Sequence, residues 1–344
     1  MATGIGSLPH QQVSAASDLI VATLPEAPFW PQLPNLNYRE NMYAQYAEQF
    51  PGMVVDAQGK RIFVDAGRDD FSSQLEVFYD LILHDRVSSF AISKEYAAGL
   101  WEVPFRLQAE QETLQLAMIK GQVTGPISFG LTVATTDKKP IIYDDTLADV
   151  LVKHLVMKTR WQEQFLQQLF PGLPVMMFFD EPYMVSFGTA FCSLGRETVV
   201  EMLETVFAAV DGLSGVHCCG NTDWSLLLQT SVDVLNFDAY EFADHLFLYR
   251  EDLHRFLDRG GCLAWGIVPT SEAILKESAA SLLQRFATQL EELEKAGFSR
   301  RKILEQSFIT PSCGCGSLPL PWAETIFRMT GELSRHVRRT YGLQ

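Results

Sequence analysis

Short apolar runs alternate along the chain with longer stretches in which apolar residues recur every three or four positions. The longer stretches predict helices, the clearest of them at 147–170, 196–211, 271–296 and 322–341. The short runs, each of which ends in polar or glycine-containing residues, predict eight strands, at 3–8, 88–93, 117–123, 174–179, 215–219, 232–237, 262–268 and 307–312.

Strands that alternate with helices predict a parallel sheet whose helical connections pack outside it. Eight is the strand number of a (β/α)8 barrel, and 344 residues fall within the span of one barrel with insertions. The alternative is an open doubly wound sheet, but Leu8 and Pro9 follow the first run where that fold has a helix-opening glycine. We therefore expect an α/β fold in which residues 1–344 form a single (β/α)8 TIM barrel.

Residues 25–71 do not follow this repeat. They contain a proline-bearing run at 30–34, a helical patch at 40–49, and a segment at 54–64 that predicts a β-hairpin. An insertion of this length after the first strand would lie above the end of the barrel at which active sites are built. It is expected either to act as a lid or only to cap the barrel.

Composition excludes several classes of function. No apolar run reaches the roughly 18 residues of a membrane helix, and residues 1–8 lack the features of a secretory signal, so we expect no membrane partner and a cytoplasmic location. A formal net charge of −15 without clustered Lys and Arg argues against a nucleic-acid partner. Six cysteines are too few for a disulfide scaffold, yet four of them fall in two tight clusters, at 218–219 and 313–315, which favours metal or thiol chemistry.

Candidate metal ligands fall where separate predicted strands end, and a barrel builds its active site there. The fifth strand ends in His217 and Cys219, whose side chains point the same way because they are two positions apart. A Cys-Gly-Cys-Gly turn follows the eighth strand, where Cys313, or alternatively Cys315, would complete the site. Two thiolates and an imidazole suit zinc, and a fourth position left open is typical of catalytic zinc. The alternative is that these cysteines are buried and inert.

Carboxylates follow two further strands. Asp180 and Glu181 could act as general acid and base, or one could hold a substrate ammonium while the other caps a helix. Asp238, after the sixth strand, could orient His217, serve as a fourth metal ligand, or cap a helix. We predict a catalytic role for Asp180 and Glu181, and a metal site formed by His217, Cys219, Cys313 and Asp238.

The motifs at the strand ends, taken in order, are similar to those of a known family. They are Ile5-Gly6-Ser7-Leu8-Pro9, Val123-Thr124-Gly125, Asp180-Glu181-Pro182, His217-x-Cys219, Val232-Asp233-Val234 with Asp238, and Pro311-Ser312-Cys313-Gly314. Over residues 4–330, apart from 25–71, the chain resembles the C-terminal catalytic barrel of cobalamin-independent methionine synthase. The run at 217–222 is also similar to the corrinoid-dependent methyltransferases of methanogens, which share a superfamily with uroporphyrinogen decarboxylase.

The resemblance implies zinc-dependent transfer of a methyl group to a thiol, with homocysteine as the expected acceptor. It places zinc on His217, Cys219 and Cys313, with Asp238 in the position of the family's glutamate ligand and Glu241 or the substrate as the alternative. It assigns homocysteine binding to Ile5, Gly6, Ser7, Glu95 at the end of the second strand, and Asp180.

The methyl donor stays open between a methylated corrinoid such as methylcobalamin, free or on a corrinoid carrier protein, and methyltetrahydrofolate. Zinc would lower the pKa of the bound thiol, and the thiolate would attack the methyl carbon. Two alternatives are a lyase resembling uroporphyrinogen decarboxylase and a non-catalytic zinc- or corrinoid-binding homologue. The lyase needs arginines near the N-terminus, where Arg39 is the only one before Arg61. Retention of Glu95 and Asp180 argues against the non-catalytic homologue.

Overall fold

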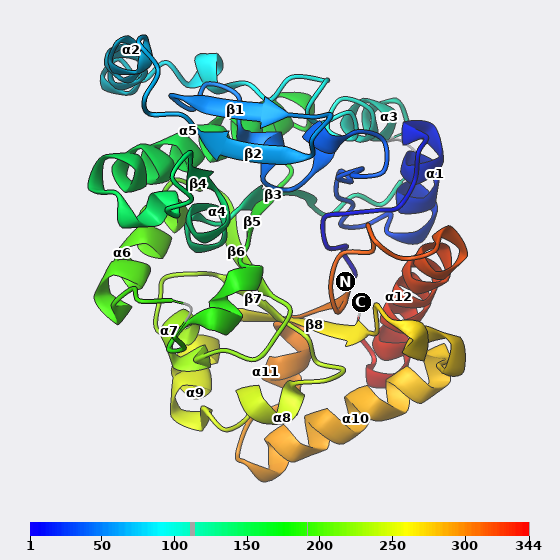
Figure 1. Cartoon of the computed structure of the whole chain (residues 1–344). Helices are drawn as coiled ribbons and strands as arrows, with labels where there is room; N and C mark the ends of the chain where they lie inside the picture. The colour runs from blue at the N-terminus through cyan, green and yellow to red at the C-terminus, as the bar shows by residue number, and fades with distance from the viewer. Residues whose placement is uncertain (111–113, 191, 344) are drawn as a thin grey trace.

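Two β-sheets, with helices packed around the larger one, make up the computed structural model, which describes residues 1–110, 114–190 and 192–343 (Figure 1). The larger sheet is parallel, has the strand order β3-β5-β6-β7-β8-β9 and curves into half a barrel. The smaller sheet has the order β1-β2-β4. The strands are β1 Met53–Asp56, β2 Arg61–Val64, β3 Ile119–Thr124, β4 Ala134–Thr135, β5 Val175–Asp180, β6 Leu213–Cys218, β7 Val234–Phe237, β8 Cys262–Val268 and β9 Ser307–Pro311.

Helices α4 to α11 lie between successive strands of the larger sheet, α1 to α3 precede its first strand, and α12 follows its last (Figure 1). They are α1 Val13–Thr23, α2 Phe71–Leu83, α3 Val103–Glu110, α4 Pro126–Thr132, α5 Asp145–Leu169, α6 Arg196–Phe207, α7 Trp224–Leu228, α8 Ala243–Leu246, α9 Arg250–Asp258, α10 Ala279–Lys295, α11 Arg300–Glu305 and α12 Leu320–Tyr341. Short 3-10 helices are η1 Tyr38–Glu40, η2 Ala44–Tyr46, η3 Val87–Phe90, η4 Ile141–Tyr143, η5 Pro182–Ser186 and η6 Glu272–Lys276.

The helices expected near 147–170, 196–211 and 322–341 are confirmed as α5, α6 and α12. The stretch at 271–296 is divided, because Ser278 forms a capping box with Ser281 and starts α10 there. Among the described residues, no helix combines the length and the apolar character that crossing a bilayer requires.

The expected closed eight-stranded TIM barrel is wrong, because two of the eight predicted strands do not form. The first half of residues 88–93 belongs to the 3-10 helix η3, in which the buried side chains Val87 and Phe90 are three positions apart, and 91–93 form neither helix nor strand. That spacing is the period of a 3-10 helix and not of a strand. Residues 3–8 run as an extended segment with isolated bridges, Ala2 to Ile309 and Ser7 to Gln32, in place of a regular ladder.

Two extended segments cover the edges of the half-barrel. Along β9, the Thr3 amide donates to the Ile309 carbonyl at 3.1 Å. Along β3, the Lys120 amide donates to the Pro28 carbonyl at 2.9 Å. These contacts satisfy edge groups that an open sheet would expose. The start of the expected 25–71 insertion therefore borders the sheet, while its hairpin is confirmed as β1 paired antiparallel with β2.

The inner face of the half-barrel is apolar at its amino end and polar at its carboxyl end. The apolar floor consists of Ile5, Met118, Met176, Phe178, Val234, Ala264 and Phe308, together with Ala27. Successive inward positions two residues further along these strands carry Asp180, His217, Asn236 and Thr310. The inward side chains of β5, β6, β7 and β9 are thereby apolar at the floor and polar at the end at which the parallel strands finish.

Close packing of the N-terminal segment against residues 26–32 generates a first prediction. A Cβ atom on Gly4 would lie 2.1 Å from a ring carbon of Phe29, so Gly4→Ala forces one of the two segments to move. We expect the variant to lose about 1 to 3 kcal/mol of unfolding free energy, measured in urea. Gly67→Ala, where an added Cβ meets nothing closer than 3.5 Å, is the control. Equal stability of the two variants would contradict this packing.

Candidate metal centre

A cavity of about 390 Å³ opens at the carboxyl end of the half-barrel. It lies between the strand ends on one side and residues 32–42 on the other. Its lining comprises Ile5, Gly6, Ser7, Gln32, Pro34, Asn35, Glu40, Asn41, Met42, Asp180, Pro182, His217, Cys219, Cys313, Gly314, Gly316 and Ser317. Most of the residues predicted from the sequence therefore meet here, and part of the 25–71 segment forms one wall.

Three potential metal ligands lie together on the wall of this cavity. One ligand atom from each of His217, Cys219 and Cys313 falls within 4.8 Å of the others. His217 is on β6, Cys219 follows its last residue, and Cys313 follows β9. Cys218, between the first two, points away and is fully buried, with its thiol 3.5 Å from the Gly220 carbonyl. The alternation predicted for this strand is therefore confirmed.

Asn236 on β7 fixes the orientation of the His217 imidazole. Its side-chain oxygen contacts His217 Nδ1. Its Nδ2 donates to the Ala264 carbonyl at 2.9 Å and to Thr310 Oγ1 at 2.8 Å. The amide group therefore presents its oxygen to His217, and this oxygen can only accept a hydrogen bond from the imidazole. His217 therefore carries a proton on Nδ1 and presents Nε2 to the cavity, as a metal-binding imidazole does.

Two thiols this close compete for one negative charge. A hydrogen bond from Cys313, and then the neighbouring imidazole of His217, lower the pKa of Cys219 to about 4. The pKa of Cys313 is raised, because the Cys219 thiolate and burial both oppose a second charge. Burial disfavours the imidazolium of His217, but contact with Cys219 outweighs burial and raises its pKa. In this pair, the single negative charge is therefore favoured on Cys219.

The donor set fits a divalent metal ion that prefers nitrogen and sulfur. In a tetrahedral site with zinc-like bond lengths, sulfur ligands stand roughly 3.8 Å apart, so ligand atoms within 4.8 Å need move only about an ångström inward. A cation would remove the competition between the two thiols, because both could then be thiolates. Three protein ligands on a cavity wall also leave one coordination position facing the cavity.

Asp238, predicted as a metal ligand, lies outside the three-residue group. Its Oδ1 accepts hydrogen bonds of 2.9 Å from the amides of Tyr240 and Glu241 and so caps the turn after β7. Burial raises the pKa of this carboxyl to about 6. Of the roles considered for Asp238, the structure supports the cap, and orientation of His217 falls to Asn236 instead.

Asp180 is the carboxylate that faces the cavity. It is 5% exposed, lines the cavity, and its Oδ1 has no hydrogen-bond partner. Burial raises its pKa, against the attraction of His217 and Lys120. A buried carboxylate oxygen without a donor is rare in a folded protein and requires an explanation. Asp180, which the sequence predicts to bind substrate, therefore lies on the wall of the cavity.

Glu181, predicted as a general acid or base or as a helix cap, lies at the start of a helix. Its two carboxylate oxygens accept from the amides of Ile127 at 2.9 Å and Ser128 at 2.7 Å, at the start of α4. It does not line the cavity. Neighbouring Asp and Glu side chains in an extended segment point to opposite faces, so one of the pair enters the cavity and the other the helix layer.

Glu95, predicted to bind homocysteine, lies away from the cavity, with a side chain 65% exposed and paired with Arg39 at 2.9 Å. Its placement depended on a second strand that does not form. A buried carboxylate that the sequence did not single out, Glu40, lines the cavity instead. It accepts from the amides of Ala98 at 2.7 Å and Leu33 at 3.2 Å, and burial raises its pKa to about 7.

The Ile5–Ser7 segment lines the cavity and is tied to the turn that carries Cys313. The Ser7 carbonyl accepts from the Cys315 amide at 2.7 Å, and Ser7 Oγ accepts from the Gly316 amide at 3.1 Å. A Cβ on Gly314 would lie 2.5 Å from Ser7 Oγ. Glycine in this turn is therefore required by the close approach of the two loops.

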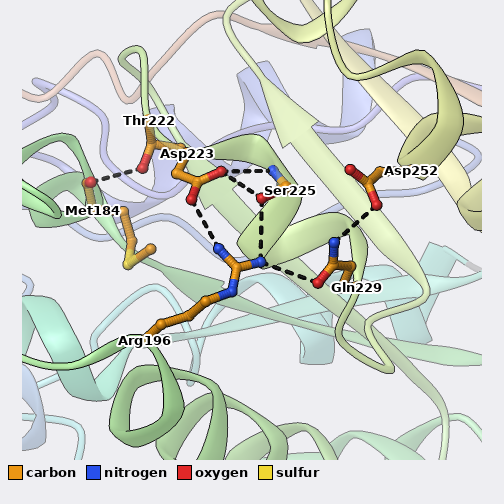
Figure 2. Close-up of polar contacts among 7 residues, drawn as sticks. All are labelled: Met184, Arg196, Thr222, Asp223, Ser225, Gln229 and Asp252. Carbon is orange, nitrogen blue, oxygen red and sulfur yellow. Dashed lines mark hydrogen bonds and ion pairs between the residues drawn. The ribbon is translucent and has the colours of Figure 1, made fainter.

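A polar network holds the loop that follows Cys219. Figure 2 shows Arg196, at the start of α6, donating to Asp223 at 2.8 Å, and to Ser225 and Gln229 at 3.1 Å. In the same view, Thr222 donates to the Met184 carbonyl at 2.7 Å. This contact links the loop after β6 to η5, which follows Asp180. The two loops that bear cavity residues are thus fixed to each other.

Comparison with models of protein families and with curated proteins returned no match. The assignment of function therefore rests on the geometry of the cavity and on the chemistry of its residues.

Removal of either thiol of the cluster is expected to abolish metal binding. Cys219→Ala and Cys313→Ala leave two ligands each, and the variants should stay folded because both side chains lie at the cavity and not in the core. Metal content by mass spectrometry and circular dichroism would measure the two effects. Cys262→Ala, at the opposite end of the sheet, is the control. Stoichiometric metal in both cluster variants would refute the site.

Loss of the imidazole support is expected to weaken the site without destroying it. Asn236→Leu removes the acceptor for His217 Nδ1 and should reduce metal affinity roughly 10- to 100-fold, measured by competition with a chromogenic chelator. Asn236→Asp keeps an acceptor and should retain more of the affinity. Unchanged affinity in Asn236→Leu would show that His217 is oriented in another way.

Proposed function

We propose that this protein is a zinc-dependent methyltransferase that moves a methyl group to a thiol acceptor, with homocysteine as the acceptor that the cavity suits best. One observation supports this most: the three-ligand His217, Cys219 and Cys313 cluster opens onto the same cavity as Asp180, a buried carboxylate with an unpartnered oxygen. The metal cluster would bind the thiol of the acceptor, and the carboxylate of Asp180 would bind its ammonium group.

The charges of the lining favour an amino thiol. Asp180 and Glu40 supply carboxylates, and none of the described lining residues is a lysine or arginine. A cationic group on the ligand is therefore attracted, and its carboxylate must be received by neutral groups, such as the backbone near Gly6 and Ser7. The same lining disfavours the lyase alternative, whose substrate carries several carboxylates that need arginines.

A zinc ion held by the cluster would act as a Lewis acid that lowers the pKa of the acceptor thiol. Asp180 would hold the amine, so that the acceptor sulfur is directed at the open side of the cluster. Asn236 would keep Nδ1 of His217 protonated and the ring fixed. In the transfer, the sulfur–methyl bond forms as the bond between methyl and donor breaks, and alignment of the two substrates supplies much of the rate.

The donor is proposed to be a methylated corrinoid, free or on a carrier protein, or methyltetrahydrofolate. A cavity of about 390 Å³ is at the small end of ligand sites and suits the acceptor, so the donor would reach the sulfur from the mouth.

An assay of methionine formation tests the proposal directly. Zinc-loaded protein is incubated with homocysteine and either methylcobalamin or methyltetrahydrofolate, and methionine is quantified by mass spectrometry. We expect product with one donor, and none with Cys219→Ala. If zinc binds but neither donor gives product and homocysteine does not bind, the protein is instead a non-catalytic zinc-binding homologue.

Asp180→Asn tests the amine contact within the same function. Loss of a hydrogen bond between charged groups costs about 1.5 to 3 kcal/mol, so we expect affinity for homocysteine to fall at least tenfold, measured by calorimetry. The des-amino analogue of homocysteine, which cannot make this contact, should bind both proteins equally. An equal loss of affinity for homocysteine and for the des-amino analogue would show that Asp180 does not bind the amine.

A further inference from the structure

Lys120 is a charged side chain enclosed in the interior of the half-barrel. It lies on β3 and is 0% exposed. Its ammonium donates one hydrogen bond, to Gln122 Oε1 at 3.3 Å, and forms no ion pair with any carboxylate in the described part of the chain. Burying a charge without an ion pair is unfavourable, and few side chains of a core do so without a function.

Aromatic rings make up much of the surroundings of this ammonium. It lies 4.5 Å from the centre of the Phe178 ring and 5.7 Å from that of Phe29, both within the range of cation–π attraction. Burial lowers the pKa of Lys120 to about 8, and Asp180 is the one charged group that opposes this shift. The nearby carboxylate of Asp180 thus favours the charged form of Lys120.

The sheet register places this charge directly beneath the cavity. Lys120 is opposite Met176, Gln122 is opposite Phe178, and the next inward level of β5 is Asp180. Since the Lys120 ammonium contacts both Gln122 and Phe178, its side chain extends one level toward the carboxyl end of the sheet. Only the level of Asp180 then separates the ammonium from the cavity.

We propose that Lys120 is a positioning residue of the amine subsite, whose buried ammonium balances the charge of Asp180 from the interior and so keeps that carboxylate in place on the cavity wall. The subsite is thereby organised before a ligand arrives. Fixed charges raise affinity in this way because little free energy is spent on ordering them when the ligand binds. The nature of the ligand amine rests on the proposed function. The interaction between Lys120 and Asp180 is independent of the proposed function.

Lys120→Met tests the proposal, because methionine keeps most of the length and removes the charge. We expect the zinc-loaded variant to bind homocysteine at least tenfold more weakly, by calorimetry, with no change for the des-amino analogue. Lys120→Arg should recover part of the affinity. In an Asp180→Asn background, Lys120→Met should have no further effect.

Lys158→Met is the matched control. Lys158 is equally enclosed, but it donates to Gln49 at 2.8 Å and to the Ala91 carbonyl at 3.2 Å, away from the cavity lining. Its substitution should leave homocysteine binding unchanged. Three results would overturn the proposal. The Lys120→Met variant could bind homocysteine normally, or it could lose affinity for homocysteine and the des-amino analogue equally. The substitution could also still weaken homocysteine binding in the Asp180→Asn background.

Urea unfolding separates this proposal from the proposed function. Unfolding of the single and double variants at positions 120 and 180 forms a double-mutant cycle that needs no ligand. We expect the two substitutions to be non-additive, with Lys120→Met costing stability only when Asp180 is present. If the wild-type protein binds no homocysteine, the proposed function is wrong, but this double-mutant cycle still tests whether Lys120 and Asp180 interact. Additive effects would overturn it.

Discussion

The register of the six parallel strands is the constraint on which the rest of the structure depends. It sets Asp180 opposite His217 and His217 opposite Asn236, at the level just above an apolar floor. Each strand contributes one inward side chain at each level, so a one-residue slip in any strand would replace a cavity residue by one that faces the helices. The metal cluster needs this register, because Cys219 reaches Cys313 only when β6 and β9 end at the same level.

Polar groups at this end of the sheet are nearly all hydrogen-bonded, and the exceptions are therefore informative. The amide nitrogen of Asn236 donates to two acceptors, and its oxygen accepts from His217. Both carboxylate oxygens of Glu181 accept from backbone amides at the start of α4. Asp180 keeps one oxygen without a partner. A buried polar atom without a partner costs free energy unless a ligand supplies one. The ammonium of Lys120, which has no ion-pair partner among the described residues, lies one level below this carboxylate.

Six of the eight predicted strands, and the positions of His217, Cys219, Cys313 and Asp180, could be predicted from the sequence because alternation and strand ends are local properties. The other strand predictions failed where tertiary packing decided: residues 3–8 follow a sheet edge as isolated bridges, and 88–93 wind into η3. Glu95 was misplaced together with its strand. Glu40 begins the helical patch at 40–49 and does not follow a predicted strand, so no strand end indicated it as a cavity residue. Asn236 could have been found, because it lies two positions before Asp238, in line with the inward face.

X-ray absorption at the zinc edge, recorded on purified protein before and after addition of homocysteine, tests most directly whether this cavity brings a thiol to a metal. The arrangement of His217, Cys219 and Cys313 predicts a bound zinc with one imidazole and two sulfur ligands, which gains one sulfur when homocysteine is added. A zinc shell that does not change although homocysteine binds, or the absence of zinc at this site, would contradict it.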